Sequence, residues 1–124
     1  MPLSIRVVNF DTGNPTQMTS GSLAVRNQRL VTSSPIVIGV SDEIINVNIS
    51  SGSSSCALPS ASSRGGLPLT FKDVGGNFAA HSLTVTPAGA DTIDGQPSLT
   101  LSGNFQSINL VPANDGTTAG WFSQ

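Results

Sequence analysis

Very few residues in this chain have the chemistry of a catalytic or metal-binding group. His81 is the only histidine, so a metal site built from several histidines is excluded and one candidate base remains. No serine lies in the Gly-x-Ser-x-Gly pattern that exposes a nucleophile. We therefore expect His81 to cap the start of a hairpin strand, and we expect the protein to be no enzyme.

Asp91 and Asp94 are the one pair of carboxylates with suggestive spacing. They could supply oxygens to calcium or act as a general acid and base. A calcium loop needs oxygen ligands at alternate positions, and Ile93 occupies one of these. The segment is more typical of a tight turn at Asp94-Gly95, in which the Asp91 carboxylate accepts backbone N–H groups. We expect neither a metal nor a cofactor.

Three other features also have ordinary structural interpretations. Lys72 and Asp73 are expected to form an exposed strand end with compensating charges. Cys56 is the only cysteine, so it has no disulfide partner in the chain and lacks the companions of a zinc site. Gly75-Gly76 precedes no helix that could aim its N-terminus at a phosphate. None of the three predicts chemistry.

Composition excludes two classes of partner. The chain has 124 residues, enough for one domain, and only 10% of them are charged, against about 25% in a typical soluble domain. The net charge is -2 and the five basic residues are scattered, so we expect no nucleic acid binding. No apolar run approaches the roughly 20 residues that span a bilayer, and the start does not resemble a signal peptide. We expect no membrane insertion, and synthesis as a soluble cytoplasmic product.

Short alternations of apolar and polar residues dominate the sequence, while prolines and glycines interrupt any helical period. About eight short strands at a spacing of about ten residues are typical of a sandwich or jelly roll. We predict an all-β protein, an antiparallel β-sandwich or jelly roll with two packed sheets. Its core is expected from the apolar residues of Ile45–Ile49, Leu67–Phe71, Leu83–Val85, Leu99–Leu101 and Ile108–Leu110.

Turn residues suggest how these strands are connected. Leu67–Lys72 and Ser82–Thr86 are predicted to form a β-hairpin around a loop at Gly75–Asn77. Ser50–Gly66 is rich in serine, glycine and proline, and it predicts a long connection that Leu58 pins to the end of a sheet. Residues 112–116 are predicted to form another loop.

The aromatic residues near the C-terminus are informative because aromatics are rare in this chain. Trp121 is the only tryptophan, and Phe122 follows it. A lone tryptophan in such a position usually closes a core or fills an interface. We take Trp121 and Phe122 as candidates for a subunit interface.

A longer succession of motifs resembles a known family. LPSA, PLTFKDVGGN, HSLTVTPAGADTIDG, SLTL, SINLV and the terminal Trp121 are similar to the small trimeric knob domains of tailed-phage virions. These occur on tail needles, spikes, fibres and head decorations, and their fold is similar to tumour-necrosis-factor-like jelly rolls. The match covers about Ser41 to Phe122, and FKDVGGN and DTIDG are its most specific parts. The resemblance implies a homotrimer with a passive structural or adhesive role.

The departures from that family predict a mode of attachment. Needle and fibre knobs sit on long shafts, but this chain has no heptads and little sequence before its first clear core strands. We divide it into an N-terminal arm at residues 1–30 and a knob domain at residues 31–124. Ile5, Val7 and Phe10 alternate as in an edge strand, and Arg6, with Arg26 and Arg29, would suit an acidic coat surface. The alternative is that Leu3–Phe10 is the first strand of the sandwich.

Two functions remain open. In the first, the protein is a virion structural protein, a trimeric capsid decoration or cement protein on the outer surface of the particle. Its arm would bind the major capsid protein and stabilise the shell. In the second, it is the receptor-binding knob of a tail fibre, spike or needle, and the Ser50–Gly66 loop with other apical loops contacts a host-surface glycan or protein.

Overall fold

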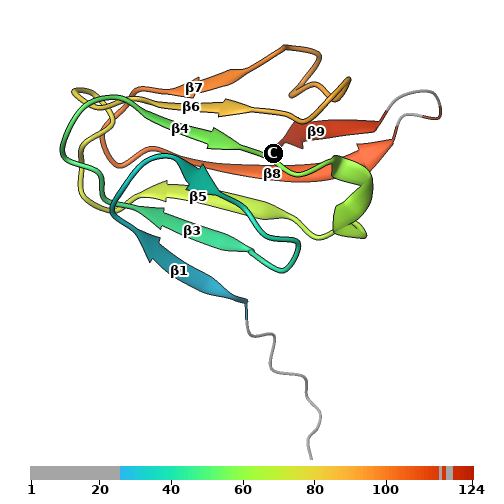
Figure 1. Cartoon of the computed structure of the whole chain (residues 1–124), viewed down its shortest axis with the longest axis horizontal. Helices are drawn as coiled ribbons and strands as arrows, with labels where there is room; N and C mark the ends of the chain where they lie inside the picture. The colour runs from blue at the N-terminus through green and yellow to red at the C-terminus, as the bar shows by residue number, and fades with distance from the viewer. Residues whose placement is uncertain (1–25, 115, 117–118) are drawn as a thin grey trace, which may run out of the picture.

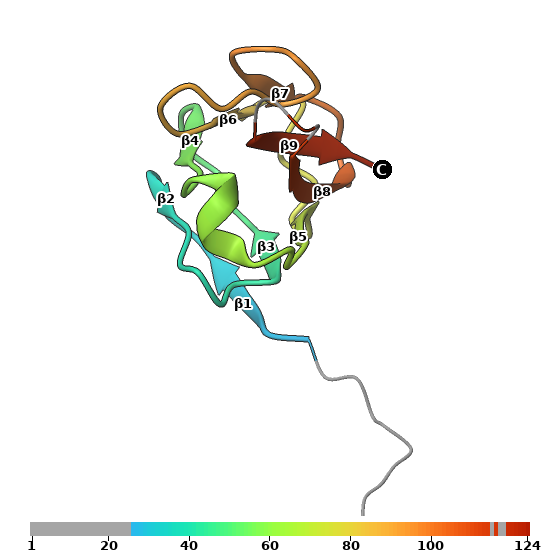
Figure 2. The same cartoon turned by 90° about the vertical axis from the view of Figure 1, so that its right-hand side faces the viewer.

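The computed structural model describes residues 26–114, 116 and 119–124. Ile5, Arg6, Val7 and Phe10, and the strand expected over Leu3–Phe10, lie outside the described residues. Within the described part, nine strands form two sheets that face each other across one core (Figure 1, Figure 2). The described part also contains one short 3-10 helix. The predicted all-β fold is confirmed.

One sheet has five strands and the other has four. The larger sheet has the order β1 (Gln28–Val31), β3 (Ile44–Val47), β5 (Leu69–Asp73), β8 (Ser107–Asn114) and β9 (Ala119–Ser123). The smaller sheet has the order β2 (Ile36–Val37), β4 (Ser54–Ala57), β6 (Leu83–Thr86) and β7 (Leu99–Leu101). The 3-10 helix η1 (Ala61–Arg64) packs beside β8 and β9 at one end of the core (Figure 2).

From β1 to β6 the chain changes sheet at every strand and so winds as a flattened coil (Figure 1). β1, β3 and β5 are parallel neighbours, as are β2, β4 and β6. β7, β8 and β9 then pair antiparallel with β6, β5 and β8 respectively. The expected antiparallel pairing is therefore wrong among the first six strands. Parallel neighbours need a crossover connection between them, and here each connection passes through a strand of the opposite sheet.

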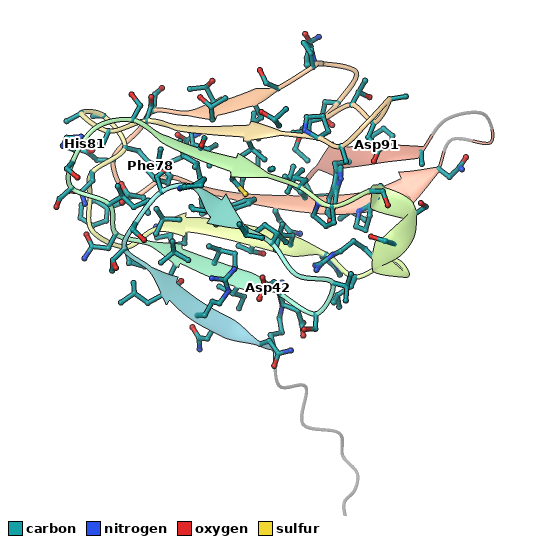
Figure 3. The ribbon with its side chains drawn as sticks, viewed as in Figure 1. Asp42, Phe78, His81 and Asp91 are labelled. Carbon is teal, nitrogen blue, oxygen red and sulfur yellow. The ribbon has the colours of Figure 1, made fainter. Side chains whose placement is uncertain are left out.

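The predicted hairpin is also wrong. Leu67–Lys72 and Ser82–Thr86 correspond to β5 and β6, which belong to different sheets. The segment between them is too long for a tight hairpin loop, and its Phe78 is buried (Figure 3). Phe78 thus anchors a crossing from one sheet to the other. The alternation predicted both strands, but it does not specify the partner of a strand.

Two segments that were predicted as loops contain strand residues. Ser50–Gly66 includes β4 and η1, and β4 lies between β2 and β6. Its inward-facing residues are small, which is why they gave no strand signal. Leu58 is buried, as expected. β8 continues through Pro112, which is tolerated because β5 pairs with β8 only as far as Leu110 and leaves one side of β8 free there.

The predicted core is confirmed at most positions. Trp121 is fully buried, and Ile93 forms a bridge with it that connects the loop after β6 to β9. Leu67, Leu99 and Ile108 are only partly buried. The predicted residues that are buried are Ile45, Val47, Ile49, Leu69, Phe71, Leu83, Val85, Leu101 and Leu110.

Trp121→Ala is expected to lower the free energy of unfolding by about 3–5 kcal/mol, because it empties the site of a large, fully buried side chain. Urea denaturation followed by circular dichroism measures this change. Phe122→Ala in the same strand is the matched control; its side chain is partly exposed, so the cost should be below about 1 kcal/mol. Equal losses in the two variants would contradict the burial of Trp121.

Candidate functional site

The single candidate base is held by a backbone contact. His81 lies just before β6, at the same end of the sheets as Phe78, which we call the loop end (Figure 3). Its Nδ1 is 2.8 Å from the carbonyl oxygen of Gly52. This position agrees with the expected place at the start of a strand. Among residues 26–114, 116 and 119–124, no three His, Cys, Asp or Glu side chains gather closely enough to hold a metal ion.

The two carboxylates of the Asp-Thr-Ile-Asp-Gly segment hold different elements. Asp91 Oδ2 accepts the backbone N–H of Ala61 at 2.8 Å, at the start of η1. Asp94 accepts the N–H of Ser123 at 3.0 Å and also its hydroxyl group, and these bonds lower the pKa of Asp94. Asp94 and Gly95 both have positive φ, as the predicted tight turn requires. The predicted turn is confirmed, but the Asp91 carboxylate does not bond across it as expected, because it accepts its N–H group from η1.

Asp73 is fully buried, so the expected exposed strand end is wrong. Its Oδ2 accepts the backbone N–H of Phe78 at 3.0 Å and that of Phe105 at 2.9 Å. Lys72 Nζ donates to the carbonyl of Phe105 and forms no pair with Asp73. The alternation that points Phe71 inward also points Asp73 inward, so the sequence carried a signal that we did not use.

The hydrogen bonds at Asp73 keep its carboxylate ionised. Burial by itself raises the pKa of Asp73, but the backbone N–H groups of Phe78, Asn77, Phe105 and Gly76 outweigh it and lower the pKa below its usual value. A single carboxylate therefore ties the loop after β5 to the turn before β8.

Gly75 and Gly76 are in close contact with side chains from other segments. The amides of Asn48 and Asn77 lie against Gly75, where a Cβ would be 2.1 Å from Asn48 Oδ1, and Asn77 Nδ2 donates to that oxygen at 2.9 Å. The ring of Phe105 lies against Gly76, where a Cβ would be 2.6 Å from the ring. Only glycine allows both approaches.

Phe105 combines an unusual backbone with an exposed ring. Its φ is 61°, a left-handed conformation that costs a bulky residue about 1–3 kcal/mol. Its side chain is 59% exposed. The bonds from Asp73 and Lys72 hold this conformation in place. We call the surface made by Phe105, Asn48 and Asn77 on the two glycines the diglycine platform.

A second buried charge lies at the other end of the core. Arg64 in η1 is 4% exposed; its guanidinium donates to the carbonyls of Gly39 at 2.8 Å and Pro68 at 3.1 Å, and also to that of Asp42. It lies 5.9 Å from the centre of the Trp121 ring. Burial lowers the pKa of Arg64, yet a guanidinium remains charged at neutral pH.

The two aromatic candidates for an interface differ in exposure. Trp121 is buried within its own chain, where it closes the core. Phe122, the next residue of β9, has 36% of its surface exposed. Their interface role stays a prediction, in which Phe122 supplies the accessible ring.

The expected N-terminal arm ends earlier than residue 30. Gln28, Arg29 and Leu30 belong to β1 and pair with β3. Arg29 forms an ion pair with Asp42 at 2.9 Å, and Arg26 one with Glu43 at 3.5 Å. These two arginines are therefore paired within the chain, and their attraction to an acidic coat surface stays a prediction.

Two remaining features offer no reactive group. Cys56 is 2% exposed, and burial raises the pKa of its thiol to about 12, so it is an ordinary core residue. A pocket of about 190 Å³ between η1 and the β8–β9 hairpin is lined by small, uncharged residues: Ala61, Ser62, Gly65, Gly66, Pro112, Ala113, Asn114 and Ala119. Within the described residues no helix is long and apolar enough to span a membrane.

Comparisons with known proteins do not identify the chain. No protein-family model matches it, and no curated protein does so either. The resemblance to phage knob domains therefore stays an expectation.

Asp73→Asn is expected to lower the free energy of unfolding at neutral pH by about 2–3 kcal/mol, because an amide replaces a buried charged acceptor. The pKa of Asp73 is lower in the folded protein than in the unfolded chain. Its contribution is thus present above the unfolded pKa of about 4 and is lost as the pH falls through the folded pKa. Urea denaturation at pH values on both sides of that range measures the change.

The matched control for this experiment is Asp94→Asn. Asp94 is exposed, and its positive φ suits asparagine, so the loss at neutral pH should be small. If the difference between wild type and Asp73→Asn persisted unchanged at acid pH, the assigned role of the carboxylate would be wrong.

Proposed function

We propose that this chain is a structural protein of a tailed-phage virion, a trimeric decoration protein on the outer surface of the capsid. The resemblance of its motifs to virion knob domains supports this role. The proposal concerns role and assembly, because the parallel pairs of the first six strands are not those of an antiparallel jelly roll. The capsid decoration would stabilise the shell by binding only its assembled state.

The observation that carries the proposal is the exposed edge formed by β1, β2 and the residues up to Val40, which we call the first coil. β1 and β2 are edge strands, and Leu30, Val37 and Val40 beside them are 60%, 74% and 61% exposed. An edge strand with apolar side chains favours strand addition or apolar docking. Residues 1–25 precede this coil directly in the sequence. We infer that the open coil and the residues before it bind the major capsid protein.

The trimer is proposed to form at the opposite edge of the larger sheet, where Phe122 lies in β9. This arrangement leaves the first coil of each subunit free for the particle. Three weak contacts in one trimer then act together, because the first one raises the effective concentration of the other two.

Sedimentation equilibrium at micromolar concentration is expected to give the mass of three chains. Phe122→Glu should shift the protein toward monomer, because it places a charge in the proposed subunit interface. Val37→Glu introduces the same charge at a more exposed position on β2; it is the control and should leave the trimer intact. A monomeric wild-type protein would refute the trimer.

Deleting residues 1–14 is expected to give a folded trimer that no longer binds capsids of the phage that encodes it. Cosedimentation with capsids that lack the decoration protein measures this, and Val37→Glu should weaken it as well. Phe122→Glu tests whether three linked sites are needed for tight binding. If the deletion abolished folding instead, Leu3–Phe10 would be an integral strand of the sandwich, as in the alternative interpretation.

A further inference from the structure

The diglycine platform presents an exposed aromatic ring that the proposed attachment to the capsid does not use. The ring of Phe105 is fixed on one side by Gly76 and through its backbone by Asp73 and Lys72, while 59% of the residue is open to solvent. An aromatic face that is already held in place costs little conformational entropy when a ligand stacks on it.

Two amides complete the platform. Asn77 Nδ2 donates to Asn48 Oδ1 at 2.9 Å, and both side chains lie against Gly75, next in the chain to the glycine that contacts the ring. Among the described residues no further partner is found for Asn48 Nδ2 or Asn77 Oδ1. The pair therefore presents one donor and one acceptor, the complement of a vicinal pair of hydroxyl groups.

The charges around the platform select among ligands. Asp73 is buried, and Lys72 is engaged by the carbonyl of Phe105. A stacked nucleobase would need cations for its phosphates, which the platform lacks. The exposed apolar side chains there are only Phe105 and Val74, too few for the roughly 800 Å² that each partner contributes to a stable protein interface.

We propose that the diglycine platform binds a neutral saccharide, whose apolar C–H face stacks on Phe105 while its hydroxyl groups bond to Asn48 and Asn77. The platform adjoins only the last residue of β1, where the N–H of Asn48 donates to the carbonyl of Val31 at 2.9 Å. The chain enters β1 at Gln28, level with Ile44 in the register, which is the end of the larger sheet away from Asn48 (Figure 1). A subunit attached through the residues before β1 and the start of that strand thus keeps Phe105 and Asn77 accessible.

The test is an array of immobilised neutral and acidic glycans, probed with the full-length protein, followed by titration of the strongest neutral glycan. Phe105→Asn removes the ring and keeps the fold, because asparagine accepts positive φ more readily than phenylalanine. We expect wild type and Phe105→Tyr to bind and Phe105→Asn to lose roughly tenfold or more in affinity, as truncation of a central aromatic anchor does. The melting temperature of Phe105→Asn should be equal to that of wild type or higher.

Thr86→Ala is the control, since it changes an exposed side chain at the last residue of β6 and lies in none of the proposed binding or subunit interfaces. It should leave glycan binding unchanged. The proposal is overturned if no neutral glycan binds, if only acidic glycans bind, or if Phe105→Asn binds as well as wild type. Capsid binding by Phe105→Asn should equal that of wild type, so failure of the saccharide site and failure of the attachment proposal can be told apart.

Discussion

Each crossing between the two sheets leaves backbone N–H and C=O groups that no neighbouring strand can pair, and burial of such groups without partners is costly. One buried charge at each end of the coil binds several of them, and side chains such as Asp91 and Asn104 bind others. At one end the carboxylate of Asp73 accepts N–H groups from two loops. At the other end the guanidinium of Arg64 donates to three carbonyl groups. A carboxylate thus binds N–H groups at one end of the core, and a guanidinium binds carbonyl groups at the other.

This arrangement explains how an unfavourable backbone conformation is held at the end of the sheets that carries Asp73. The left-handed conformation of Phe105 persists because its N–H and C=O groups are both engaged, by Asp73 and Lys72. Backbone strain of this kind survives only where the surroundings determine it, and it is concentrated at sites of recognition. The edge at β1 and β2 is different in kind, because it exposes apolar side chains on strands that have a neighbour on one side only. A rigid polar end and an open apolar edge suit two different partners.

Local patterns in the sequence were sufficient for some elements and insufficient for others. The alternation around Ile45 and Leu83 predicted the inward residues, because side chains of a strand point alternately to its two faces whatever its neighbours are. The same alternation could not show that β5 and β6 lie in different sheets, since pairing depends on where the connection travels. The small residues of β4 showed no alternation of apolar and polar side chains. They form a strand because they lie between β2 and β6 in the smaller sheet.

The sequence by itself determined the all-β class, most of the core, the turn at Asp94-Gly95 and the lack of any evident catalytic motif. Each of these follows from residues close together in the chain. Only the tertiary structure decided which N–H groups bind Asp73, that Gly75 and Gly76 carry an amide pair and an aromatic ring, and that Phe105 faces solvent. Those features depend on contacts between segments distant in sequence, such as residues 73 and 105, and no local pattern specifies which distant group will supply a hydrogen bond.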